Sequence, residues 1–398
     1  LRDHAPSLSF STDMQAWVKN ATAVDDYTAQ IELTASNPRF IFSYFTNNFD
    51  NGIPIMPKHI WEGKDPESFS NFDLAQGWPV VSGPYKMAIS SPQQRVWDVR
   101  SDWWAAKIGF RELPKVERLI YLPYMEESKR VQNIIANAMD TSLDLRPPNI
   151  KSIIDANPGV STWTGKDLPL GYLDWWPVCL GFNNLEPPFN DPEVRRAVNH
   201  AIDREQLVKI GWQGAGTSSH LPLPNFPPIR TYTDEIQDLI DKYEIGVYDP
   251  AKTAEILQRK GWSKDDEDFW SRDGERLTMV VDIFGIFNDL APVLVAQLKQ
   301  AGIDASFRLT SDTFTRMAQG TARAYMMGNG GSVRDPYFTL RLYHSRFVQP
   351  TGTHAERFWR WSNPEYDAIV DKMGQTSPDD PELQNLFRQA MEIWLSEL

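Results

Sequence analysis

Paired tryptophans are the first residues of this chain whose type and spacing suggest chemistry. Trp103–Trp104 and Trp175–Trp176 are adjacent pairs, and tryptophan outnumbers tyrosine by 15 to 13. An indole ring offers a flat apolar face and one hydrogen-bond donor. A sugar ring could stack its C–H face on such a surface while polar neighbours bind its hydroxyl groups. The alternative is that these indoles fill a protein core, so position must decide between the two roles.

A glycine-rich loop, residues 327–336, is the second candidate because it follows an expected strand over 323–328. Ligands of α/β sheets lie beyond the carboxyl ends of the strands. Glycine has no Cβ, so backbone N–H and C=O groups in this loop can approach a ligand closely. The residues that we expect to bind ligand are Trp175, Trp176, Asn329, Gly330, Gly331, Ser332, Arg334 and Asp335.

Sequence motifs of common enzyme classes are missing. There is no Gly-x-Ser-x-Gly elbow and no His-Glu-x-x-His motif, and the glycines at 214 and 216 lack the lysine of a phosphate-binding loop. The paired carboxylates of a glycoside hydrolase leave no sequence trace, and the chain has 53 acidic residues. We therefore assign no catalytic residue, metal ligand or cofactor, and a glycan-degrading enzyme is the alternative from another functional class.

Net charge and hydropathy limit the kinds of molecule that this protein is expected to bind. The net charge of −13 disfavours nucleic acid, whose phosphates require a basic face. No apolar run approaches the ~18–20 residues of a membrane-spanning helix. The charged run 264–268 lacks the alternate-residue spacing of a calcium loop, which favours a solvated loop. Cys179 is the single cysteine, and its apolar surroundings predict a buried, unreactive thiol.

A strand-to-helix connection lies near the middle of the chain. Val178–Phe182 is a short apolar run that can form a buried strand. Asn183 and Asn184 end this run, and the prolines that follow favour an extended joint. Asp191 is expected to cap a helix that begins at Pro192. We predict that Asn183 and Asn184 belong to a hinge between two bodies of the protein.

The remaining sequence alternates strand and helix patterns over a length that allows two or three domains. Strands at 277–284 and 303–309 on either side of a helix at 288–300 predict a parallel βαβ unit. Further strands are expected at 28–33, 96–100, 118–122 and 141–145, after the turn at 83–85, and further helices at 131–138, after Asp249, and from 363 and 380.

Four motifs occur in order along the chain, at residues 83–86, 100–104, 182–204 and 362–367. Together they resemble the extracytoplasmic solute-binding proteins of the peptide and oligosaccharide class, which serve ABC importers. The resemblance implies an α/β, two-lobe periplasmic-binding-protein fold of class II, similar to dipeptide- and oligopeptide-binding proteins, that closes on its ligand by hinge motion. It also implies ABC permease subunits as partners, a monomer, and a periplasmic or envelope-lipoprotein location.

The resemblance further implies how the chain is divided. We expect the remainder of a small subdomain at 1–76, part of a first α/β lobe at 77–184 and a second lobe at 185–398. No export signal is present and Leu1 is not an initiator methionine, so we interpret the chain as a fragment that lacks N- and C-terminal parts. Family members place the first tryptophan pair at a turn between surface and core, and line the cleft with aromatic residues before the crossing strand.

The class of ligand follows from one position in the glycine-rich loop. In family members that bind free peptides, an aspartate of this loop pairs with the ammonium group of the peptide. Our alignment places Ser332 there, although a shift of three residues would place Asp335 there instead. A missing carboxylate and a tryptophan platform favour an oligosaccharide, with an oligopeptide or dipeptide as the alternative. A docking module with an empty cleft is the third possibility.

Overall fold

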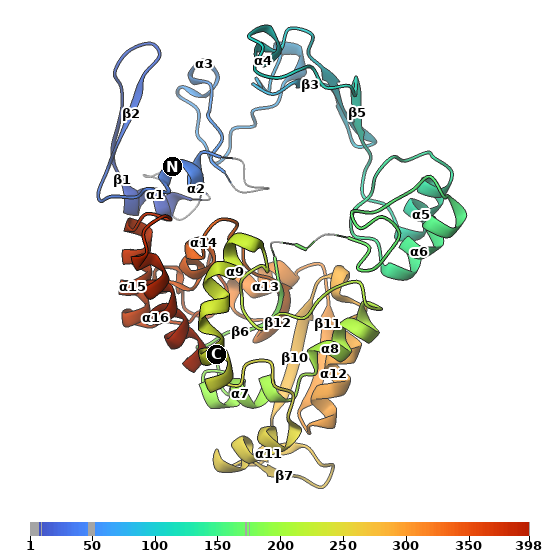
Figure 1. Cartoon of the computed structure of the whole chain (residues 1–398), viewed down its shortest axis with the longest axis vertical. Helices are drawn as coiled ribbons and strands as arrows, with labels where there is room; N and C mark the ends of the chain where they lie inside the picture. Colours follow the sequence, from blue (N-terminus) through green and yellow to red (C-terminus); the bar gives the residue numbers. More distant parts are fainter. Residues whose placement is uncertain (1–7, 9, 47–51, 172, 175, 398) are drawn as a thin grey trace. The chain divides into compact units, whose positions relative to one another are not determined.

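A computed structural model of the chain describes residues 8, 10–46, 52–171, 173–174 and 176–397 (Figure 1). The chain forms two compact units. Unit 1 comprises residues 1–35 and 40–133, and unit 2 comprises residues 36–39 and 134–398. The chain therefore passes between the units after residues 35, 39 and 133. The predicted division into three parts has its boundaries at residues 76 and 184, which differ from the boundaries of these two units, and it stays a prediction.

Unit 1 consists of antiparallel strands and short helices. Its strands form a β1–β2 hairpin and a β3-β4-β5 sheet, with bounds β1 (Val18–Ala23), β2 (Ala29–Leu33), β3 (Tyr85–Ser91), β4 (Gln94–Val99) and β5 (Arg118–Tyr121). Its helices are α1 (Ser11–Trp17), α2 (Phe40–Tyr44), α3 (Lys58–Trp61) and α4 (Trp104–Lys107), while α5 (Glu127–Ile135) spans the division between the units. Met14, Trp17, Phe40 and Tyr44 are buried together and pack α1 against α2.

The strand predicted at 141–145 is wrong, because these residues form irregular backbone with a bend at Leu143 and Asp144. Asp144 has a φ of 55°, a left-handed conformation that is incompatible with a β-strand. Helix α6 (Pro147–Ala156) follows, with proline in its first turn. Strand β5 pairs antiparallel with β4, and no strand follows at 141–145, so the helix expected at 131–138 does not connect two strands.

Unit 2 contains a four-stranded mixed sheet in the order β11-β10-β12-β6. Its elements are β6 (Val178–Phe182), β10 (Thr278–Ile283), α12 (Ala291–Gln300), β11 (Asp304–Leu309) and β12 (Ala324–Gly328). Strand β10 pairs in parallel with β11 and β12, whereas β6 is antiparallel to β12. Since α12 connects the parallel strands β10 and β11, the predicted βαβ unit is confirmed.

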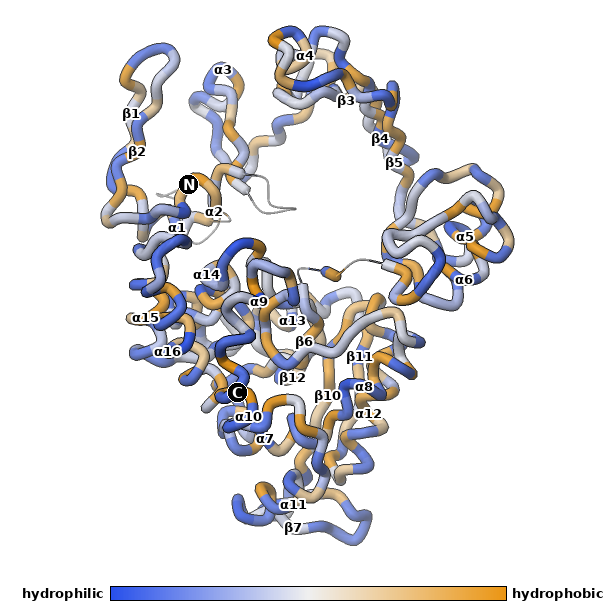
Figure 2. Tube along the Cα trace, viewed as in Figure 1, coloured by the Kyte–Doolittle hydropathy of each residue, from blue (hydrophilic) through white to orange (hydrophobic). Residues whose placement is uncertain are grey.

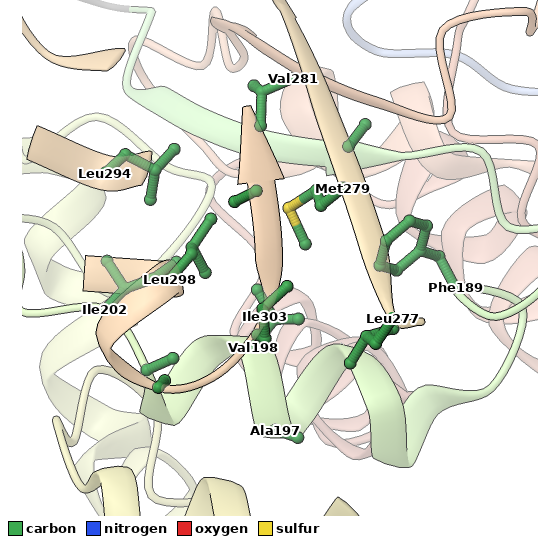
Figure 3. Close-up of a cluster of buried hydrophobic side chains, with 14 of the residues drawn as sticks. Phe189, Ala197, Val198, Ile202, Leu277, Met279, Val281, Leu294, Leu298 and Ile303 are labelled. Atoms are coloured by element: carbon green, nitrogen blue, oxygen red, sulfur yellow. The ribbon is translucent and has the colours of Figure 1, made fainter. Parts of the chain in front are cut away.

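Both faces of this sheet are buried under helices. On β12, Ala324 and Met326 enter one hydrophobic core, whereas Tyr325 between them enters the other. This alternation follows from strand geometry, which points successive side chains to opposite faces. Figure 3 shows the first core, where Met279 of β10 and Leu298 of α12 lie together. The chain therefore forms the α/β layers expected from its sequence, and Figure 2 shows hydrophobic residues along β10 and β11.

The helices expected after Asp191 and Asp249 and from residues 363 and 380 are present in unit 2, together with further helices that the sequence analysis did not predict. The carboxylate of Asp191 accepts a hydrogen bond from the N–H of Glu193 at the start of α7, and Asn363 caps α15. The bounds are α7 (Pro192–His200), α8 (Arg204–Gln206), α9 (Pro227–Thr233), α10 (Gln237–Lys242), α11 (Pro250–Arg259), α13 (Thr313–Gln319), α14 (Tyr337–Leu340), α15 (Pro364–Gln375) and α16 (Glu382–Glu397).

The charged run 264–268 lies in a small hairpin sheet. Its strands are β7 (Ser263–Lys264), β8 (Trp270–Arg272) and β9 (Glu275–Arg276). The Asp265 carboxylate accepts backbone hydrogen bonds from Glu267 and Phe269 and pairs with Arg276, so it stabilises the turn itself. Within the described ranges, no group of acidic, histidine or cysteine side chains is arranged to hold a metal ion. No helix in those ranges has the length and hydrophobicity to cross a membrane.

Candidate functional site

The glycine-rich loop leaves the carboxyl end of β12, where it is tied to the residues that precede β6. Asn329 donates its backbone N–H to the Pro177 carbonyl at 2.9 Å, next to the pairing of Gly328 with Val178. Trp176 packs directly on Gly328, where an added Cβ would lie 2.8 Å from the Trp176 Cβ. A glycine is therefore needed here, and the structure brings Trp176 and the loop together. Trp175 lies outside the described residues.

The first half of the loop depends on glycine conformations and one buried amide. Gly330 and Gly331 have φ angles of 135° and 109°, a region that other residues rarely adopt. Asn329 is buried, and its side-chain amide donates a hydrogen bond to the Tyr343 hydroxyl. The Tyr343 ring in turn stacks on Trp359, with ring centroids 5.2 Å apart. The loop is thus fixed to an aromatic cluster of unit 2.

Ser332 is fully buried and is used to begin helix α14. Its N–H donates to the Thr339 hydroxyl at 3.2 Å, and the Thr339 N–H donates to the Ser332 hydroxyl at 2.9 Å. Thr339 is buried as well. This reciprocal pair satisfies two backbone N–H donors. A buried N–H group without a hydrogen-bond partner would destabilise the fold. Ser332 therefore shapes the loop from inside, and a role in contacting ligand stays a prediction.

Asp335 is a buried carboxylate with both oxygens occupied. Its Oδ2 accepts from Nε of Arg39 at 3.0 Å, and its Oδ1 accepts from the N–H of Tyr337 at 3.0 Å. The side chains of Arg39 and Asp335 are only 4 % and 8 % exposed, so this ion pair is internal to unit 2. The neighbouring Arg334 is exposed and pairs with Asp379 at 2.8 Å. Both charged groups predicted in the loop therefore have partners within the protein.

The residues predicted as a hinge are hydrogen-bonded within unit 2. The Asn183 side-chain amide donates to the Gly320 carbonyl at 2.8 Å, and its backbone N–H donates to the Arg323 carbonyl. Asn184 donates both its backbone and its side-chain N–H to the Trp359 carbonyl. The strand before them and the helix after them both belong to unit 2. Their function as a hinge stays a prediction.

The first tryptophan pair is held by a shared acceptor in unit 1. The indole N–H groups of Trp103 and Trp104 both donate to the Ser82 carbonyl, at 3.0 and 2.9 Å. The Trp104 ring also stacks on Phe110 with an interplanar angle of 14°. Because both indole donors are used inside unit 1, this pair has a structural role, as the family resemblance implied.

The family is decided by a match over most of the chain. The family model of the bacterial extracellular solute-binding proteins, family 5 (middle), matches residues 1–351. The chain belongs to this family. Family 5 is a family of binding proteins, and its fold accounts for the helix-covered mixed sheet of unit 2. The resemblance drawn from the four sequence motifs is thus confirmed.

Related family 5 proteins bind chemically diverse ligands. Heme-binding protein A of Haemophilus influenzae is 25 % identical over 384 residues, which cover 94 % of this chain and 62 % of that protein. The periplasmic oligopeptide-binding protein of Thermotoga maritima, solved with mannohexaose, superposes with a TM-score of 0.78 at 21 % identity, covering 98 % of this chain and 71 % of that chain. The oligopeptide-binding protein AppA of Bacillus subtilis, solved with a nonapeptide, superposes with a TM-score of 0.71 at 17 % identity, covering 97 % and 71 %.

The single cysteine of this family 5 protein should resist thiol reagents. Cys179 is partly buried and packs against the second hydrophobic core, and desolvation there raises the pKa of its thiol to about 12. At pH 8 only about one molecule in ten thousand would carry the reactive thiolate. We expect negligible labelling by a disulfide reagent in buffer and stoichiometric labelling in urea. Rapid labelling of the folded protein at pH 8 would contradict the burial of this thiol.

Proposed function

We propose that this protein is the extracytoplasmic substrate-binding component of an ABC importer, which captures an oligosaccharide and delivers it to the permease subunits. Family membership supports the binding role, and a structural relative solved with mannohexaose makes a sugar ligand reasonable. The proposal includes a monomer in the periplasm or anchored to the cell envelope as a lipoprotein. An oligopeptide or dipeptide is the alternative ligand, since other relatives carry peptide-binding names.

The observation that carries the choice of ligand is the charge balance of the glycine-rich loop. Asp335 is the only acidic residue between 327 and 336. Its carboxylate is already neutralised by Arg39 and hydrogen-bonded by the Tyr337 N–H. A peptide ammonium would have to displace a buried guanidinium, which is costly, or use a carboxylate from another part of the chain. A neutral ligand with many hydroxyl groups needs no such charge and suits Trp176 beside this loop.

Ligand capture would follow from a shift between open and closed states. A ligand favours the state in which it makes more contacts, and it can shift the equilibrium only by its difference in affinity for the two states. In this proposal Trp176 provides the stacking face, and the loop after β12 provides polar groups. The residues proposed to form or shape this site are Trp175, Trp176, Asn329, Ser332, Arg334 and Asp335, with Gly330 and Gly331 allowing close approach.

Isothermal titration tests the class of ligand. The protein is titrated with mannohexaose and shorter mannose oligomers, and separately with tripeptides to pentapeptides that have free amino termini. We expect heat from the sugars and none from the peptides. Micromolar or tighter binding of peptides, with silent sugars, would reverse the choice of ligand. Chromatography of the sugars after incubation would reveal steady cleavage if the protein were a glycan-degrading enzyme.

The Trp176→Ala variant should bind mannohexaose more weakly by about 1–3 kcal/mol, the scale of one lost stacking surface. Trp163→Ala serves as the matched control, because Trp163 is a largely exposed indole elsewhere in unit 2. Ser332→Asp should not strengthen sugar binding, since Ser332 is fully buried and a carboxylate at this position would be costly to desolvate. Equal losses for Trp176→Ala and Trp163→Ala in the titration would argue against a stacking platform at Trp176.

A further inference from the structure

Arg39 occupies an unusual place in the chain. It ends the short segment 36–39, which belongs to unit 2 although residues up to 35 and from 40 belong to unit 1. Only 3 % of Arg39 is exposed, and its backbone N–H donates to the Asn37 side chain at 3.1 Å. A charged side chain this deeply buried requires partners, because an unpaired buried charge is very costly. Those partners show which parts of unit 2 hold the segment in place.

Three features of unit 2 meet at the Arg39 guanidinium. Nε donates to the Asp335 carboxylate at 3.0 Å, in the loop that follows β12. Nη1 donates to the carbonyls of Met373 and Thr376, at 2.8 and 2.5 Å, where helix α15 ends. The guanidinium carbon also lies 5.2 Å from the ring centroid of Tyr337, the first residue of α14. A single side chain thus links segment 36–39 to the glycine-rich loop and to a helix terminus.

The contact with α15 has its own physical explanation. The last carbonyls of a helix lack partners within the helix, and a cation near them is stabilised by the helix dipole. The contact with Asp335 goes beyond such a capping role. Because Asp335 also fixes the start of α14 through the Tyr337 N–H, the ion pair bears directly on the shape of the loop at 329–336.

We propose that Arg39 is a positioning residue that couples the order of the glycine-rich loop to the chain crossing at residues 36–39. It acts through Asp335 and does not itself contact ligand. When the loop becomes more ordered, the ion pair orders segment 36–39, at one of the places where the chain passes between the units. The response to ligand rests on the proposed function, whereas the coupling without ligand does not.

Hydrogen exchange followed by mass spectrometry tests the coupling on the full chain. Arg39→Gln and Asp335→Asn each remove the charge attraction from one side of the ion pair. We expect each variant to speed exchange about tenfold or more both in peptides that cover 31–45 and in peptides that cover 327–340. Peptides from β10 and α12 should be unchanged. Arg259→Gln is the control, because Arg259 is an exposed arginine in an ion pair with Glu193.

Two comparisons separate coupling from simple capping of α15. Asp335→Asn leaves the Arg39 contacts with the α15 carbonyls intact, so a pure capping role predicts no change at 31–45 in this variant. Arg39→Lys keeps the charge and should restore much of the protection lost in Arg39→Gln. Unchanged exchange at 31–45 in Asp335→Asn overturns the proposal, even if Arg39→Gln does not fold.

The same hydrogen-exchange measurement is then repeated in the presence of mannohexaose. In the wild-type protein we expect slower exchange in both peptides, whereas in Arg39→Gln only the loop peptide should become protected. Equal protection of 31–45 in both proteins would overturn the coupling. If mannohexaose protects neither peptide in the wild-type protein, the choice of ligand fails, and the measurements without ligand still decide the role of Arg39.

Discussion

Replacing Arg360 with methionine should lower the free energy of unfolding of unit 2 by about 3–5 kcal/mol. Arg360 is 2 % exposed, and burial lowers the pKa of its guanidinium. Methionine would fill much of the volume but could donate no hydrogen bond, so several buried carbonyls would lose their partner. The carbonyls that accept from Arg360 belong to Met317, Ala318, Gln349, Thr353 and Phe358.

The measurement must report on unit 2 alone, because tryptophan fluorescence would combine both units. Hydrogen exchange of β10 and β12 peptides across a urea series meets this need. Arg388→Met is the matched control, since Arg388 lies on the surface of α16 and pairs with Asp238. A surface ion pair contributes up to about 1 kcal/mol. If Arg360→Met costs no more than this control, the network of carbonyls is not a major source of stability.

The parts of the fold that could be predicted have local signals. The apolar spacing of residues 288–300, between the apolar runs 277–284 and 303–309, predicted the βαβ unit. Helix and strand periodicity can be recognised within segments of this length. Asp191 before Pro192 marked the start of α7 since capping involves neighbouring residues. The strand at 141–145 failed because five residues carry little periodicity, and a single left-handed residue, Asp144, is enough to prevent a strand.

The missing parts of the site depend on contacts between distant residues. Arg39 and Asp335 are 296 positions apart, so no local pattern relates them. The position of the glycine-rich loop could be inferred from the strand before it, but the inward direction of Ser332 could not. Its partner Thr339 follows seven residues later in a helix of only four residues, too short to give a periodic signal. The sequence therefore predicted where the loop lies, but not which residues its side chains contact.

Burial is what distinguishes the roles of the tryptophans. Trp176 is partly buried beside Gly328, next to the loop, whereas Trp270 of β8 is 2 % exposed within the first hydrophobic core of unit 2. Amino-acid composition cannot distinguish the two residues, because both are simply counted among the 15 tryptophans of the chain. A stacking surface must be reachable by a ligand, and a core indole is not. Replacement of Trp176 should therefore lower ligand affinity, whereas replacement of Trp270 should lower the free energy of unfolding.

Trp270→Ala should lower the free energy of unfolding of unit 2 by about 3–5 kcal/mol, through lost apolar contacts and an unfilled cavity. The indole N–H donates to the Ala301 carbonyl at 2.7 Å, and the Lys264 ammonium lies 4.5 Å from the ring centroid. Trp270→Phe keeps most of the apolar surface, so its loss should be clearly smaller. The same exchange measurement in urea gives the stability, and titration with mannohexaose below the unfolding transition gives the affinity. Folded Trp270→Ala that loses sugar affinity as strongly as Trp176→Ala would show that burial does not separate core indoles from binding ones.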